Sequence, residues 1–322
     1  MRVGFIGGVN SSLTTLKKLV EHDINIVAVF GYKPSENVIV SGYNDLEDFS
    51  LNNGLNFVPF TRINERTADI VGLELDVLFV VGISQLVSED IINAPKLGCI
   101  GYHPTLLPRG RGRAPIAWLV HECEDGAANF FLLNDVADSG PIFVQEPFSV
   151  REGDNAESVE EKLLLATEVA LDRWLPELKK GEWNPIPQQE YFATEYGIRK
   201  PDDGLIDWKA CSIEISRLIR AASRPHPGAY TFYNNDKLII ESCKLEQKMK
   251  IKGCVGRILK IDNDSALIQT GQGLIWISNI RPDLKLKVGD RLGYQAEDEI
   301  YKLKNQILNL STKINSLLKE MK

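Results

Sequence analysis

Residues 98–116, Gly-Cys-Ile-Gly-Tyr-His-Pro-Thr-Leu-Leu-Pro-Arg-Gly-Arg-Gly-Arg-Ala-Pro-Ile, decide how this sequence folds. A short apolar run ends at Tyr102, and His103 follows it at once. A Pro-containing loop with three arginines then leads into a helix predicted from about Pro115. Ligands of open α/β sheets bind beyond the carboxyl ends of the strands. His103 therefore stands where a functional side chain is expected.

The segment before this stretch alternates short apolar runs with helical patterns. We predict strands at 3–6, 24–30, 56–58, 76–81 and 99–102, and a helix at 12–21. Strands separated by helices at this spacing favour a parallel sheet that helices cover on both faces. The first half of the chain is therefore predicted to be an α/β domain.

The second half changes character after a long helical pattern at 157–178, which a polar, Pro-rich connector follows. A helix is predicted at 212–222, and close-set short strands at 237–242, 255–260, 266–269 and 274–278. Such strands with turn residues between them are typical of a small β-barrel or open sheet. We predict a first domain at 1–188, a β-rich domain at 189–290 and a separate helix at 296–322.

The last segment carries an apolar heptad repeat. Ile, Leu and Met alternate at spacings of three and four, in the order Ile300, Leu303, Ile307, Leu310, Ile314, Leu317 and Met321. Ile at the a positions with Leu at the d positions favours a parallel two-stranded coiled coil. The same stripe also suits a helix that packs onto its own domain. Its narrow width and polar flanks favour a homodimer through residues 300–321.

Composition is that of a soluble globular protein and limits the partners. Hydrophobic residues make up 43%, charged residues 25%, and the formal net charge is −7. No apolar run approaches the ~20 residues that span a bilayer, and the first residues lack a signal-peptide layout, so no membrane partner is expected. Five scattered cysteines without metal spacing indicate a cytoplasmic protein without a metal site. The acidic balance argues against nucleic acid as a partner.

The side chains that carry chemistry are a histidine, carboxylates and arginines. A second stretch, Asn134-Asp-Val-Ala-Asp-Ser-Gly-Pro-Ile142, places Asp135 and Asp138 on a Gly-containing turn. A histidine beside an aspartate can move protons near neutral pH, because the carboxylate orients the imidazole and raises its pKa. Each residue taken singly also has a structural explanation. His103 could be a structural histidine at a strand end, and Asp138 could form an Asx-turn. The arginines could belong to a solvated loop.

Together, these stretches resemble the catalytic core of the folate-dependent formyltransferases, which include methionyl-tRNA formyltransferase and nucleotide-sugar N-formyltransferases. The family pattern is Asn-x-His-x-Ser-Leu-Leu-Pro, then Arg-Gly-x-x-Pro and, further on, Asp-x-Gly. This sequence is similar at 103–108, 111–115 and 138–140, with Thr105 in the place of Ser. Residues 200–208 and 224–230 resemble the later part of the tRNA and sugar enzymes, so the likeness covers most of residues 1–285. It implies a Rossmann-like formyltransferase domain followed by an OB-like, β-barrel-like domain.

The resemblance assigns roles to residues of this sequence. His103 would assist proton transfer while an amine takes the formyl group of 10-formyltetrahydrofolate, and Asp138 would position the histidine or a water and raise the basicity of the histidine. The folate would lie against Gln85, Leu86, Val87, Arg113, Asn134, Asp135, Val136, Ala137 and Asp138. A diphosphate on the acceptor would pair with Arg109 or Arg111 through bidentate contacts.

The sequence departs from the family two residues before the histidine. The family asparagine donates a hydrogen bond to the oxyanion that develops on the formyl group, which is typically worth ~3 kcal/mol or ~100-fold in rate. This chain has Gly101 there instead. Asn129, on a predicted neighbouring strand, is one substitute donor, and a water admitted by the smaller glycine is another. The third explanation is an impaired enzyme.

The acceptor is inferred from charge and from the resemblance. Methionyl-tRNA formyltransferases need a basic surface, usually including a Lys- and Arg-rich loop after the second strand. Residues 31–48 instead hold one lysine and four acids. A nucleotide-linked amino-dideoxy sugar is therefore the expected acceptor, with glycan or lipopolysaccharide biosynthesis as the setting. A methionyl-tRNA formyltransferase-like enzyme and a non-catalytic binder of folate or sugar nucleotides are the alternatives.

Overall fold

The computed structural model describes residues 1–36, 38, 40–234, 236–294 and 296–320. By its contacts the chain divides into two compact units. Unit 1 comprises Met1–Asp203 and Arg220–Pro227, and unit 2 comprises Gly204–Ile219 and Gly228–Lys322. The connector at 189–203, which the sequence assigned to the second domain, thus belongs to unit 1 by its contacts.

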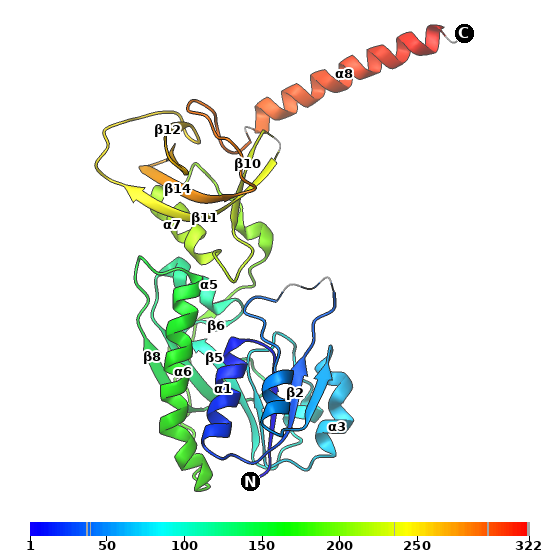
Figure 1. Cartoon of the computed structure of the whole chain (residues 1–322), viewed down its shortest axis with the longest axis vertical. Helices are drawn as coiled ribbons and strands as arrows, with labels where there is room; N and C mark the ends of the chain where they lie inside the picture. The colour runs from blue at the N-terminus through cyan, green and yellow to red at the C-terminus, as the bar shows by residue number, and fades with distance from the viewer. Residues whose placement is uncertain (37, 39, 235, 295, 321–322) are drawn as a thin grey trace. The chain divides into compact units, whose positions relative to one another are not determined.

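A seven-stranded sheet forms the centre of unit 1 (Figure 1), in the order β3-β2-β1-β4-β5-β7-β8. The first five strands in this order are parallel, β7 runs antiparallel to β5, and the edge strand β8 runs antiparallel to β7. The strands are β1 (Val3–Gly7), β2 (Ile26–Tyr32), β3 (Phe57–Phe60), β4 (Val77–Val80), β5 (Gly98–Thr105), β7 (Gly126–Leu132) and β8 (Ile142–Phe148). The predicted parallel-rich α/β fold is confirmed. Strand order reverses at β1, which lies between β2 and β4.

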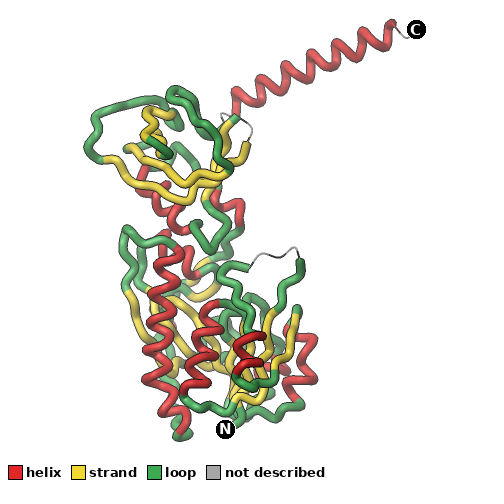
Figure 2. Tube along the Cα trace, viewed as in Figure 1, coloured by secondary structure: helices red, strands yellow, loops and turns green. Residues whose placement is uncertain are grey.

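Helices cover both faces of this sheet (Figure 2). The helices of unit 1 are α1 (Asn10–Glu21), α2 (Glu47–Asn52), α3 (Thr67–Val71), α4 (Glu89–Ile92), α5 (Pro115–Glu122) and α6 (Ala156–Lys179). On one face Leu16 of α1 and Trp174 of α6 pack with Phe79 of β4. On the other face Ile70 of α3 and Ile91 of α4 pack in a second cluster. Burying one such side chain contributes roughly 1.5–3 kcal/mol, so the sheet is fixed from both sides.

The long helix α6 follows directly from its sequence. Asn155 caps it, because its Oδ1 accepts the Ser158 N–H at 2.9 Å and the Ser158 hydroxyl oxygen accepts the Asn155 N–H at 3.0 Å. The apolar face that the pattern predicted is at most 6% exposed at Val159, Leu163, Ala166, Ala170, Trp174 and Leu178. The periodic pattern therefore predicted both the helix and its buried face.

Two short strands of unit 1 were missed. β6 (Arg111–Gly112) and β9 (Glu195–Tyr196) pair in parallel, with Arg111 opposite Glu195 and Gly112 opposite Tyr196. A strand of two residues carries no periodicity that a sequence pattern can reveal. This pairing fastens the connector to the arginine loop that follows β5.

Unit 2 holds a five-stranded antiparallel sheet in the order β10-β11-β14-β13-β12. Its elements are most of α7 (Ser212–Ala221), whose last residues from Arg220 belong to unit 1, and the strands β10 (Ala229–Tyr233), β11 (Asp236–Glu246), β12 (Ile258–Asp262), β13 (Ser265–Gln269) and β14 (Leu274–Arg281). The predicted β-rich second part is confirmed, with β10 as a strand that the sequence reading had not placed.

The last helix, α8 (Ala296–Glu320), confirms the predicted C-terminal helix. None of its described residues is buried, and Ile307 and Leu310 are 63% and 59% exposed. Met321 and Lys322, at the end of the predicted heptad segment, lie outside the described residues. None of the helices in the described part of the chain is both long and apolar enough to cross a membrane.

Candidate active site

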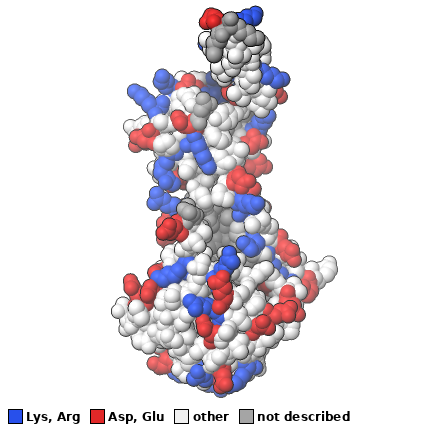
Figure 3. All heavy atoms as spheres, turned by 90° about the vertical axis from the view of Figure 1, so that its right-hand side faces the viewer, with Lys and Arg blue, Asp and Glu red and all other residues white. Residues whose placement is uncertain are grey.

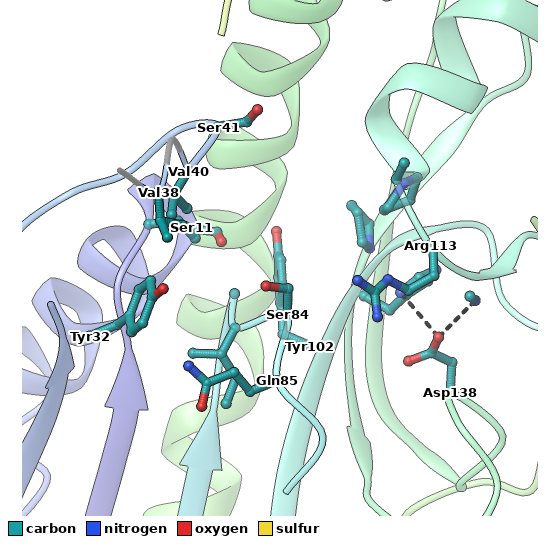
Figure 4. A pocket seen from close by; sticks show the side chains of 18 residues that line it. Ser11, Tyr32, Val38, Val40, Ser41, Ser84, Gln85, Tyr102, Arg113 and Asp138 are labelled. Carbon is teal, nitrogen blue, oxygen red and sulfur yellow. Dashed lines mark hydrogen bonds and ion pairs between the residues drawn. The ribbon is translucent and has the colours of Figure 1, made fainter. Parts of the chain in front are cut away.

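A cavity of about 490 Å³ lies beyond the carboxyl ends of β1, β4 and β5. Figure 4 shows side chains converging on it from several loops of unit 1. Its lining residues are Val9, Ser11, Tyr32, Val38, Val40, Ser41, Gly82, Ile83, Ser84, Gln85, Tyr102, His103, Pro104, Gly112, Arg113, Ala114, Pro115 and Asp138. The cavity thus lies at the reversal of strand order, where open α/β sheets bind their ligands.

His103 borders this cavity with a ring that is held in one tautomer. The residue is 4% exposed, and its Nε2 lies 2.8 Å from the carbonyl oxygen of Gly110. Because a carbonyl oxygen only accepts, Nε2 carries the proton and donates it. In the neutral ring Nδ1 therefore keeps its lone pair, 3.4 Å from Oδ2 of Asp138. Nδ1 is the atom that can take a proton from a ligand.

Asp138 is positioned by glycines of the motif. Its Oδ2 accepts the Gly112 N–H at 2.9 Å, an interaction drawn in Figure 4. Gly112 has a φ of +104°, and a Cβ there would lie 2.5 Å from the Tyr196 carbonyl oxygen. At Gly140 a Cβ would lie 1.6 Å from the Leu132 carbonyl oxygen. A side chain at either glycine would therefore displace the Asp138 loop or its hydrogen-bond donor.

Burial and charge act on the pKa of His103 in opposite directions. Burial disfavours the imidazolium and lowers the pKa of His103 below its ordinary value. The Asp138 carboxylate and the Gly110 carbonyl raise the pKa, but the effect of burial outweighs theirs. His103 is therefore neutral near pH 7, and the neighbouring carboxylate stabilises the ring once it has taken a proton.

Asn129 lies opposite His103 on β7 but does not line the cavity. Its side chain is buried, and its Nδ2 donates to the carbonyl oxygens of His103 at 2.7 Å and of Thr105. Its Oδ1 accepts from Gln145 Nε2 at 2.6 Å. These contacts contradict the prediction that Asn129 donates to the oxyanion. The amide instead forms its hydrogen bonds inside the sheet, where the register between β5 and β7 is irregular between His103 and Thr105.

Gly101 lies in β5 with Leu133 filling the space beside it. A Cβ built on Gly101 would lie 2.4 Å from Cδ2 of Leu133 and 3.0 Å from the Phe131 ring. The volume that an asparagine side chain would enter is therefore occupied by apolar carbon. This contradicts the expectation that the glycine admits a water on that side. Of the three explanations, only the impaired enzyme is left, unless another element supplies a donor.

Arg111 is not available to a phosphate. Its side chain is 6% exposed, and its guanidinium pairs with the Glu190 carboxylate at 2.6 and 2.9 Å and with Gln188 Oε1 at 2.8 Å. The Glu190 carboxylate raises the pKa of Arg111 further. Gln188 in turn donates to the carbonyl oxygens of Asp138 at 2.7 Å and of Gly140 at 2.8 Å. Arg111 thus positions the Asp138 loop, which contradicts its predicted contact with a diphosphate.

The other two arginines of this loop lie in different places. Arg109 is exposed and lines a separate cavity of about 210 Å³, so the structure does not bring it to the predicted site. Arg113 is exposed and lines the main cavity together with His103 and Asp138. Its backbone N–H donates to the Tyr196 carbonyl oxygen at 3.1 Å, which fixes the start of the side chain.

Part of the predicted folate set lines the main cavity, namely Gln85, Arg113 and Asp138. The remaining members, Leu86, Val87, Asn134, Asp135, Val136 and Ala137, lie outside its lining. Gln85 uses its amide on a neighbouring loop, because Oε1 accepts the Ile63 N–H at 2.9 Å and Nε2 donates to the Thr61 carbonyl at 2.7 Å. Leu86 and Val136 are 83% and 59% exposed.

Sequence reasoning missed the wall of the cavity that carries hydroxyl groups. Ser11, Tyr32, Ser41 and Ser84 contribute to it, and Figure 4 shows Ser11, Tyr32 and Ser41 on the side away from Asp138, with Ser84 beside Tyr102. The available signal was the Gly-Gly turn after β1, since a Cβ on Gly8 would lie 2.6 Å from Cβ of Tyr32. Glycines at such a close approach mark a turn that presents its neighbours to a ligand.

Comparison with known families agrees with this geometry. The family described as "Formyl transferase" matches residues 10–175, and "Formyl transferase, C-terminal domain" matches residues 199–289. The methionyl-tRNA formyltransferase of Caldanaerobacter subterraneus subsp. tengcongensis is 28% identical over 298 residues, which cover 90% of this chain and 95% of that relative.

Two solved structures share the fold. WlaRD, a sugar 3N-formyl transferase solved in the presence of dTDP and 5-N-formyl-THF, has a TM-score of 0.64 and 17% identity, and the match covers 88% of this chain and 99% of WlaRD. HypX from Aquifex aeolicus, in complex with tetrahydrofolic acid, has a TM-score of 0.62 and 17% identity. The match covers 88% of this chain but only 45% of HypX. From its motifs, its site and both family matches, the chain belongs to the formyl transferase family, the folate-dependent enzymes whose formyl donor is 10-formyltetrahydrofolate.

Proposed function

We propose that this formyltransferase transfers the formyl group of 10-formyltetrahydrofolate to the amino group of a nucleotide-linked amino-dideoxy sugar. The observation that carries the proposal is the hydroxyl-lined wall formed by Ser11, Ser41 and Ser84 across the cavity from Asp138. Hydroxyl groups both donate and accept hydrogen bonds, as the hydroxyls of a sugar require. A cavity of about 490 Å³ is also of the size that small molecules occupy.

The charge around the cavity supports a small acceptor. Residues 1–203 hold 31 Asp and Glu and 17 Lys and Arg. The one lysine of the loop after β2, Lys33, is already paired with Glu47 at 2.7 Å and with Asp45. On the face drawn in Figure 3, acidic and basic side chains are intermixed. A nucleic acid gains affinity chiefly where many phosphates are neutralised, and that face offers no continuous basic surface.

The site supports proton transfer through His103. The acceptor amine must lose a proton as its nitrogen bonds to the formyl carbon, and Nδ1 of His103 carries the lone pair that can take it. The imidazolium then forms beside the Asp138 carboxylate, which stabilises it. The folate supplies the formyl carbon, and its nitrogen leaves. His103 can return the proton to that leaving nitrogen, so one residue serves as base and then as acid.

The residues beside the cavity suit a folate. Leu86 and Val136 expose apolar surface on the loops that follow β4 and β7. Apolar side chains on exposed loops suit the flat faces of a pterin, and the backbone groups of 134–138 suit its polar edge. We propose that these loops hold the folate and leave the hydroxyl-lined wall for the acceptor.

Two observations favour methionyl-tRNA as the alternative acceptor. The relative described above is a methionyl-tRNA formyltransferase. Residues 204–290 hold 14 Lys and Arg against 9 Asp and Glu, so this segment is basic although the whole chain is acidic. Basic surface suits the phosphates of RNA. The experiment must therefore compare both acceptors directly.

The test incubates the purified protein with 10-formyltetrahydrofolate and either methionyl-tRNA or UDP- and dTDP-linked 3-amino and 4-amino sugars, with products identified by mass spectrometry. We expect an N-formylated sugar nucleotide and no formylated methionyl-tRNA at equal acceptor concentration. Formylated methionyl-tRNA as the only product would overturn the sugar assignment. Binding of folate and sugar nucleotide without transfer to any acceptor would identify a non-catalytic binding protein.

We also propose that the protein is a homodimer joined through α8. The a positions Ile300, Ile307 and Ile314 are 52–63% exposed on one stripe of this helix. In a parallel pair Glu299, at a g position, would face Lys304, at an e position, of the second copy. Opposite charges at this place favour the parallel orientation.

A further inference from the structure

The oxyanion of the transfer reaction has no donor from the positions that the family pattern suggests. Gly101 has no side chain, and Leu133 fills the adjoining volume. The Asn129 amide is committed to the backbone of β5. A chain that keeps His103 and Asp138 in contact therefore needs a donor from a different element.

Arg113 is the cationic side chain that lines this cavity. It comes from the loop before α5, across the cavity from the hydroxyl-lined wall, and Figure 4 shows its guanidinium extending into the cavity near Asp138. The side chain is exposed. Arg111, two residues earlier in the same loop, differs in this respect because its guanidinium is buried and paired with Glu190.

The backbone at this point is unusually well fixed for an exposed side chain. The Arg113 N–H donates to the Tyr196 carbonyl oxygen at 3.1 Å, and the preceding N–H of Gly112 donates to Asp138 Oδ2 at 2.9 Å. The residue that follows, Ala114, has a φ of +51° and is the N-cap residue of α5. Arg113 is thus anchored beside the same carboxylate that lies 3.4 Å from Nδ1 of His103.

We propose that Arg113 stabilises the oxyanion of the formyl group and replaces the asparagine that Gly101 lacks. The proposal rests on the formyl-transfer reaction but not on the identity of the acceptor. When a nucleophile bonds to the formyl carbon, the carbonyl electron pair moves to the oxygen, which becomes negative. The bond between carbon and N10 of the folate then breaks, and the proton from the nucleophile passes through His103 to N10. A guanidinium offers several N–H donors and a full positive charge to that oxygen.

The test uses an acceptor that does not depend on the sugar. Hydroxylamine attacks the formyl carbon through the same oxyanion and releases tetrahydrofolate, which is measured by absorbance. We expect Arg113→Ala to lower kcat by about 100-fold, the usual cost of one oxyanion donor. Arg113→Lys keeps the positive charge, so its kcat is expected to fall less than that of Arg113→Ala. Arg151→Ala removes an exposed arginine outside the cavity lining and serves as the matched control with unchanged rate.

Calorimetry with 5-formyltetrahydrofolate provides a readout apart from activity. We expect the Kd of Arg113→Ala to match that of the wild type, because the donor acts on charge that is absent before reaction. A Kd raised in proportion to the lost rate would instead make Arg113 a folate-binding residue and overturn the proposal.

Two rescues complete the test. Guanidinium ions are expected to restore part of the rate of Arg113→Ala, and so is a triple variant that adds Gly101→Asn and Leu133→Ala. Failure of both rescues would overturn the proposal. A wild type that formylates hydroxylamine but no sugar would overturn only the sugar assignment. A wild type that binds 5-formyltetrahydrofolate yet formylates no nucleophile would overturn the oxyanion role of Arg113 and leave the impaired enzyme as the explanation.

Discussion

Leu133 occupies the space beside Gly101, where its Cδ2 would lie 2.4 Å from a Cβ at position 101. The two positions are therefore a coupled pair. Restoring the family residue by Gly101→Asn alone should overpack the sheet and lower the free energy of unfolding by about 1–3 kcal/mol. The loss is measured by denaturant unfolding.

A substitution of Leu133 tests whether this side chain causes the loss of stability expected of Gly101→Asn. Leu133→Ala alone should also destabilise the protein, because it removes apolar contacts in the second core cluster. The double variant Gly101→Asn with Leu133→Ala should be more stable than the sum of the two single effects, with a coupling of about 0.5–3 kcal/mol. Strictly additive losses would show that the two side-chain positions do not compete for space.

Arg111 offers a second prediction, because its contacts with Glu190 and Gln188 support the Asp138 loop. Arg111→Met should lower kcat by roughly 10- to 100-fold, since a small displacement of a catalytic group has effects of this size. The KM for the acceptor should stay the same. Arg111→Lys keeps the positive charge but loses the bidentate pairing, so its kcat should lie between those of the wild type and Arg111→Met. A raised acceptor KM at unchanged kcat would restore the phosphate role that the sequence suggested.

The pH dependence of the reaction follows from His103. Burial lowers its pKa, so the acid limb of kcat/KM should lie below pH ~6.5, the ordinary value for histidine. Asp138 raises the pKa of His103, and Asp138→Asn removes that charge. In this variant the acid limb should therefore move to lower pH, while the maximal rate falls because the imidazolium is no longer stabilised. An acid limb that moves to higher pH would contradict the assignment of His103 as the base.

Periodic patterns and strand ends predicted much of this molecule. The apolar face of α6 and the position of His103 at the end of β5 both follow from local sequence. These features depend on residues close together in the chain, where hydrophobic period and strand length carry the information. The parallel sheet follows from the alternation of strands and helices for the same reason.

The predictions that were wrong concern side chains whose positions depend on contacts between residues distant in the sequence. Arg111 and Arg113 are two residues apart in one loop, yet one pairs with Glu190 while the other lines the cavity. Their difference is set by the pairing of β6 with β9, which is too short to show in a pattern. Asn129 and Leu133 likewise depend on which atoms lie opposite across β5 and β7. Motifs and residue spacing alone do not reveal such contacts between residues that are far apart in the sequence.

The exposed stripe of α8 gives the last prediction, which concerns assembly. Leu310 lies at a d position and Leu308 at a b position, and they are 59% and 65% exposed. In a parallel coiled coil, the d position enters the interface and the b position faces solvent. Leu310→Asp should therefore convert the dimer into a monomer in analytical ultracentrifugation, whereas Leu308→Asp, the same change on the same helix, should leave the dimer intact. Both variants should keep the kcat of the wild type, because the cavity belongs to unit 1. Equal effects of the two substitutions, or a wild type that sediments as a monomer at micromolar concentration, would show that the stripe serves another contact.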